Sequence, residues 1–104
     1  MDFFYRLDGS LNDLPALCEM LNVKTKNDEI FSQAAAIFHK LTIRCLAEIA
    51  QDSKQCQDGA NMEELLADAF IMITRLSLIA TDEHEMRAML TKKTANLKYE
   101  MGMV

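Results

Sequence analysis

The sequence predicts an all-α protein whose centre is a long helical hairpin within a four-helix bundle. Only three glycines and one proline occur in 104 residues, and β-branched residues do not alternate with polar ones as they do in strands. Apolar residues recur instead at intervals of three and four, which is the spacing of one helix face. The length fits one domain, so a single all-helical domain is expected over residues 1–104.

The first half of the chain is predicted to form two helices. A short helix is expected from about Asn12 to Asn22, because Pro15 suits a first turn and apolar residues follow at helical spacing. A long helix is expected from Asp28 to about Asp52, with two adjoining apolar stripes. One stripe contains Ile30, Ala34, Ile37, Leu41 and Cys45, and the other contains Phe31, Ala35, Phe38 and Ile49. The position of Cys45 in a stripe indicates a buried thiol.

A polar loop over Ser53–Ala60 is predicted to reverse the chain and complete a hairpin over about residues 28–80. Asn61, followed three residues later by Glu64, resembles the start of a helix with a capping box. Asp82 and Glu85 repeat this pattern at the start of an outer helix that is expected to end at about Met101. The outer helix has a narrower apolar stripe, formed by Met86, Met89, Leu90, Leu97 and Met101.

The two central helices carry apolar faces that are wide for so small a chain. A single four-helix unit of this length has a modest core and does not easily cover such faces. We therefore expect a homodimer that brings the broad faces of two hairpins together. The residues expected at the interface are Phe38, Leu41, Phe70, Ile73 and Leu76.

Charge and composition exclude several classes of function. The net charge of −5 disfavours binding to a nucleic-acid backbone, which requires lysines and arginines that displace counterions. The longest apolar stretch, Ala67–Ala80, is too short and too interrupted to cross a membrane. No segment resembles a secretory signal, and the three cysteines form no C-x-x-C pair. A cytoplasmic protein is expected, without nucleic-acid or membrane partners.

Four carboxylates are predicted to lie near one end of the hairpin. Glu48 and Asp52 stand four residues apart at the end of the second helix, as do Glu64 and Asp68 at the start of the third. The hairpin brings these helix ends together, and clustered carboxylate oxygens are what Mg²⁺ requires. The alternative interpretation is solvated charge at helix ends, where acidic residues in a first turn favour the helix dipole.

The segment from Glu64 to Met101 resembles the MazG-like all-α nucleoside triphosphate pyrophosphohydrolases. The resemblance is carried by the run from Leu66 to Ile73, by the break at Asp82 and Glu83, and by the closing helix. In that family an E-E-x-x-E helix and an E-x-x-D helix bind Mg²⁺, which activates the water that cleaves between the α- and β-phosphates. The resemblance implies a helical hairpin fold and, if the metal motif is complete, pyrophosphate release.

The chain departs from the family pattern at the positions that bind the metal. Glu48 and Asp68 match, but Arg44 and Cys45 stand where the first helix has carboxylates. In the E-x-x-D motif Leu65 stands at the Glu position, and Glu64 lies one residue early, which rotates its side chain by about 100°. Lys92 and Asn96, four residues apart on the last helix, are similar to a pair that contacts phosphates in the family, although an exposed and soluble helix face is the favoured explanation.

Two functions follow from these observations. The first is a binding or regulatory protein on a degenerate MazG-like scaffold, which acts by protein–protein contact as an inhibitor or accessory protein of a mobile element and needs no cofactor. The second is a divergent Mg²⁺-dependent pyrophosphohydrolase that uses the carboxylates named above. A nucleotide is a partner in the second case, and it is also compatible with the first because a positive charge at Arg44 attracts phosphate while repelling Mg²⁺.

Overall fold

The structure, a computed structural model, describes residues 13–51 and 61–103. Over these ranges the chain forms α-helices and no strands, which confirms the all-α prediction. Helix α1 spans Leu14–Val23, α2 spans Asn27–Ala50, α4 spans Met62–Ala80 and α5 spans Glu83–Glu100. The predicted loop over Ser53–Ala60 lies outside the described residues. Among the described residues, no helix is long and apolar enough to cross a membrane.

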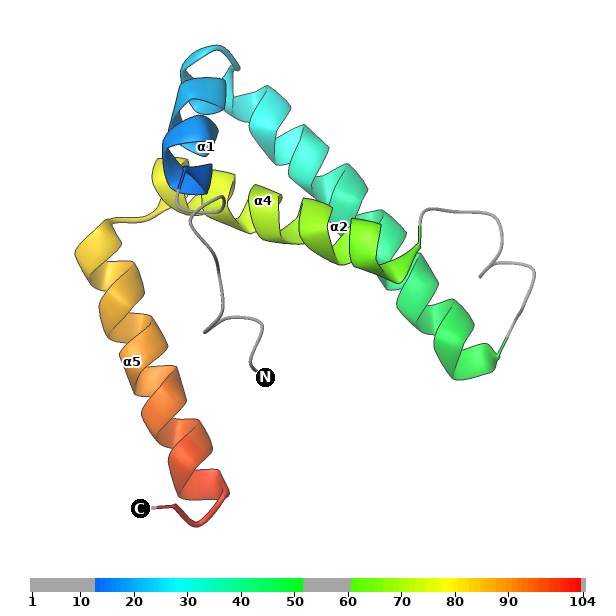
Figure 1. Cartoon of the computed structure of the whole chain (residues 1–104), viewed down its shortest axis with the longest axis vertical. Helices are drawn as coiled ribbons and strands as arrows, with labels where there is room; N and C mark the ends of the chain where they lie inside the picture. Colours follow the sequence, from blue (N-terminus) through cyan, green and yellow to red (C-terminus); the bar gives the residue numbers. More distant parts are fainter. Residues whose placement is uncertain (1–12, 52–60, 104) are drawn as a thin grey trace.

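Helices α2 and α4 form the predicted hairpin and run in opposite directions beside each other (Figure 1). Their contact encloses a small core in which Ile30, Ala34 and Met72 are buried. Half-buried side chains from both helices surround this core: Ile37, Phe38, Leu76 and Ile79. The row that contains Ile30 and Ala34 is therefore the inner stripe of α2, and the second predicted stripe lies beside it.

Local capping explains where the helices begin and end. The side chain of Asn61 accepts a hydrogen bond from the backbone N–H of Glu64 at 2.7 Å, so the predicted start of α4 is confirmed. Helix α2 ends at Ala50. The N–H of Gln51 donates to carbonyls of the last turn, and the left-handed conformation of Gln51, with φ of 54°, turns the chain out of the helix. The last helical residue, Ala50, stands two residues before Asp52, the expected limit.

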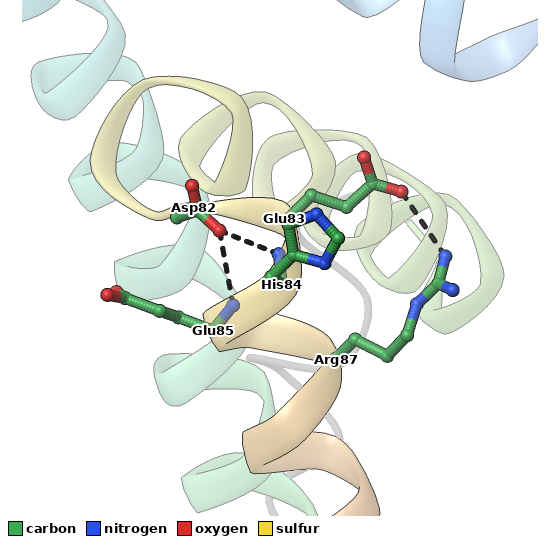
Figure 2. Close-up of polar contacts among 5 residues, drawn as sticks. All are labelled: Asp82, Glu83, His84, Glu85 and Arg87. Atoms are coloured by element: carbon green, nitrogen blue, oxygen red, sulfur yellow. Dashed lines mark hydrogen bonds and ion pairs between the residues drawn. The ribbon is translucent and has the colours of Figure 1, made fainter.

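Helix α5 begins directly after its N-cap residue Asp82, as its sequence predicts. Figure 2 shows the carboxylate of Asp82 accepting hydrogen bonds from the backbone N–H groups of His84 and Glu85, at 2.7 and 3.3 Å. An exposed ion pair between Arg87 and Glu83 spans the first turn at 3.2 Å. Unlike the other helices, α5 contains no buried residue, and it runs away from the hairpin after leaving the end of α4 (Figure 1).

Candidate interaction surface

One side of the hairpin carries a row of exposed apolar side chains that we call the hairpin face. On α2 the row contains Phe31 and Ile49, which are 50% and 79% exposed. On α4 it contains Leu66, Phe70 and Ile73, which are 52%, 41% and 50% exposed and follow one another at helical spacing. These five residues define the hairpin face.

Helix geometry places both halves of the hairpin face on the same side. Successive residues of a helix are rotated by about 100°, so the exposed row of α2 lies about 90° from its buried row. On α4 the exposed row lies about 100° from the buried row of Leu65, Ala69 and Met72, in the same rotational sense. Because the two helices are antiparallel and turn their buried rows toward each other, equal rotations bring both exposed rows to one side.

Helix α1 covers the opposite side of the hairpin, through the side chain of Arg75. This side chain is only 7% exposed. Its Nε donates to Asn22 Oδ1 at 2.9 Å, and its Nη1 donates to Gln33 Oε1 at 3.1 Å. Its Nη2 lies 3.4 Å from Thr25 Oγ1, while Asn22 Nδ2 donates back to the carbonyl of Arg75 at 3.0 Å. One arginine thus joins α4 to α2 and to the end of α1 through neutral acceptors.

In the sequence, Arg75 is one of the polar residues that interrupt the apolar stretch Ala67–Ala80, and its burial was not predicted. An arginine within such a stretch is itself a signal, because long charged side chains are rarely buried unless their donors find acceptors. The signal does not reveal the acceptors, which lie 42 to 53 residues away in the sequence.

The cysteines differ in their surroundings. Cys18 of α1 is fully buried, and burial raises the pKa of its thiol, while the nearby Arg75 guanidinium opposes part of that rise. Cys45 is exposed, so the expectation of a buried thiol is wrong there. Cys45 follows Ala34 and Leu41 at helical spacing, but it lies toward the edge of the inner stripe, about 40° from the row of Phe31.

The residues expected at a dimer interface divide into two groups. Phe70 and Ile73 belong to the hairpin face and are exposed. Phe38 and Leu76 are half-buried and pack against the core of their own chain, and Leu41 is also half-buried. Phe70 and Ile73 can therefore contact a partner without any change in the fold, whereas Leu76 already contributes to the core.

The predicted metal ligands are placed as follows. Glu48 accepts a hydrogen bond from Arg44 Nε at 3.0 Å, Glu64 is exposed in the first turn of α4, and Asp68 is half-buried one turn later. Asp52 lies outside the described residues. Within residues 13–51 and 61–103, no three His, Cys, Asp or Glu side chains are grouped closely enough to hold a metal ion. The four-carboxylate site stays a prediction.

The predicted phosphate contacts, Lys92 and Asn96, are both exposed on α5. Figure 1 shows α5 starting at the opposite end of the hairpin from the one where α2 stops and α4 starts. Within one chain, the structure therefore does not bring these two residues to Glu48 and Glu64.

No family model, characterised protein or solved structure matches this chain. The fold class defined by the structure is an all-α helical assembly built on an antiparallel hairpin. Membership of the MazG-like superfamily stays a prediction from the residues that carry the resemblance.

Proposed function

We propose that this chain is a small cytoplasmic binding or regulatory protein on a degenerate MazG-like scaffold, which acts by protein–protein contact through the hairpin face. The observation that carries the proposal is the row of five exposed apolar side chains on one side of the hairpin. Soluble monomers rarely expose extended apolar patches, and those that occur are commonly binding sites. An inhibitor or accessory protein of a mobile element would need only such a surface, and no cofactor.

A second copy of the chain is the first partner that we propose. Seven apolar residues are buried among the described residues, whereas eighteen large apolar side chains are exposed. The chain therefore leaves much of its apolar surface to be covered by association, which is the reason for expecting a homodimer. Any other protein partner would bind either the hairpin face or a surface that the homodimer leaves exposed.

A double substitution tests the hairpin face. We expect Phe70→Glu with Ile73→Glu to raise the homodimer dissociation constant by more than about 100-fold. Each side chain is about half exposed and contributes roughly 1 kcal/mol when it is covered, each change counts twice in a symmetric dimer, and each new carboxylate would have to lose water. Sedimentation at tens of micromolar protein measures this change. The matched control is Ala67→Glu, which adds a carboxylate at an exposed position of α4 that lies about 90° around the helix from the middle of the hairpin-face row. A double variant that dimerises as tightly as the wild type would contradict the proposal.

The competing function, Mg²⁺-dependent pyrophosphohydrolysis, is tested by direct assay. We expect no pyrophosphate release from any of the common ribo- or deoxyribonucleoside triphosphates, because Arg44 places a cation beside Glu48 and would repel Mg²⁺. Release that requires Mg²⁺ and disappears in Asp68→Asn, with the helical circular dichroism spectrum unchanged, would establish the enzyme instead.

A further inference from the structure

Helix α5 has an apolar stripe that its own chain does not cover. Met86 is half-buried, but Met89, Leu90 and Leu97 are 49%, 56% and 61% exposed, and Met101 beyond the helix is 74% exposed. These residues recur at the spacing of one helix face, on which Lys93 also lies, so the stripe is apolar on either side of one lysine. An isolated helix of 18 residues gains little stability in water without a packed face, so this stripe needs an apolar partner.

The link between α4 and α5 directs α5 away from its own hairpin. Thr81 and Asp82 both have extended backbone conformations, with φ and ψ of −135° and 164° and of −94° and 141°. The Thr81 hydroxyl donates to the Ser77 carbonyl at 2.7 Å, and Asp82 fixes the first turn of α5 (Figure 2). Folding α5 back onto α4 would require this two-residue link to abandon its extended form and reverse the chain.

The hairpin face and α5 match in length and in charge. At 1.5 Å per residue, the 18 residues of α5 span about 27 Å and the 19 residues of α4 span about 28 Å. From Arg87 to Lys98, α5 carries four basic and no acidic residues. Helices α2 and α4 carry six acidic and three basic residues. Over its full length α5 also contains three acidic residues, Glu83, Glu85 and Glu100, so it is the middle of the helix, and not its ends, that suits the acidic hairpin.

We propose that α5 of one chain docks on the hairpin face of a second copy, and that the second copy returns its own α5 in the same way. The inference rests on the proposed function, since it uses the hairpin face as the contact surface, and it identifies what occupies that face. A helix of this length and about 10 Å width covers roughly 270 Å² on each partner. Two exchanged helices then bury roughly 1,100 Å² in total, which passes the roughly 1,000 Å² expected of a biological interface and lies at the small end of the range.

Substitutions on α5 alone test the exchange in the full-length chain. Leu90→Glu with Leu97→Glu places two carboxylates in the stripe, while the matched control Ala95→Glu places one on the opposite side of the same helix. Because α5 has no buried residue, these variants are expected to keep the fold of α1, α2 and α4. The double variant should raise the dimer dissociation constant by at least about 100-fold, because each substitution occurs twice in a symmetric dimer. The control should keep a dissociation constant within a few fold of that of the wild type.

Comparison with the hairpin-face variant separates the two proposals. If Phe70→Glu with Ile73→Glu breaks the dimer while Leu90→Glu with Leu97→Glu does not, the hairpin faces meet directly, and the exchange is wrong although the proposed function stands. If neither variant changes the dissociation constant, both proposals fail. A wild-type chain that is monomeric at 100 μM would overturn the exchange.

Covalent trapping identifies the contact directly. Phe70 and Leu90 lie near the midpoints of α4 and α5, so they meet whichever direction the docked helix takes. Chains with Phe70→Cys and chains with Leu90→Cys, each also carrying Cys45→Ser and Cys56→Ser, are mixed and oxidised. A disulfide-linked heterodimer is expected. If the mixture stays uncrosslinked, while one chain carrying both cysteines closes on itself, α5 folds back within its own chain and the exchange is excluded.

Discussion

Ile30→Ala is expected to lower the free energy of unfolding by about 4 kcal/mol, because it removes the largest fully buried side chain of the hairpin core. Ile30 is 0% exposed and packs with Ala34 and Met72 between α2 and α4. The substitution removes three carbons and leaves a cavity whose neighbours are held by two rigid helices. Urea unfolding followed by circular dichroism at fixed protein concentration measures the change.

Val23→Ala serves as the control for this core substitution. Val23 is 83% exposed at the end of α1, so its truncation should change the free energy of unfolding by less than about 0.5 kcal/mol. A loss below about 1 kcal/mol in Ile30→Ala would mean that α2 and α4 do not pack on this row. The other apolar stripe of α2, which contains Phe31, would then be the inner one.

The sequence predicts the helices well because their signals are local. Asn61 and Asp82 both cap helices at the predicted positions, since a side-chain oxygen needs only the N–H groups two or three residues ahead. The apolar spacing of α2 and α4 is equally local, and it predicts a hairpin of two wide-faced helices correctly. Helix boundaries differ from the prediction by one or two residues, which is the scale on which helix ends vary.

What could not be predicted depends on contacts between distant segments. The two stripes of α2 are both apolar, and only the position of α1 decides which side of the hairpin remains uncovered. The apolar spacing of α5 likewise predicts which side of the helix is apolar, but it does not predict the direction of the helix axis. That direction is set by the extended backbone of Thr81 and Asp82. For the same reason, sequence spacing placed carboxylates near one hairpin end but did not establish the distances between them.

The position of α1 depends on Arg75, and Arg75→Ala is expected to lower the free energy of unfolding by about 3 kcal/mol. The substitution removes hydrogen bonds to Asn22, Gln33 and Thr25 and opens a space beside Met72. Hydrogen bonds from a charged donor contribute roughly 1.5–3 kcal/mol each, although water that reaches the freed acceptors recovers part of that loss. Urea unfolding gives the magnitude, with Arg87→Ala as the control, since its ion pair is exposed and contributes less than about 1 kcal/mol.

A second measurement shows which contact is lost. Cys18 is 0% exposed in α1, whereas Cys45 is exposed on α2, so alkylation by a maleimide reports the detachment of α1 against an internal reference. In Arg75→Ala the rate of Cys18 modification should rise at least tenfold while that of Cys45 stays constant.

The variant Arg75→Met separates the contribution of the aliphatic part of the side chain from that of the guanidinium, because methionine fills most of the space but cannot donate to Asn22 or Gln33. Protection of Cys18 in Arg75→Met equal to that in the wild type would show that α1 is held by packing alone. Loss of protection in both variants would show that the hydrogen bonds of Arg75 hold α1 against the hairpin and keep its other side as the exposed one.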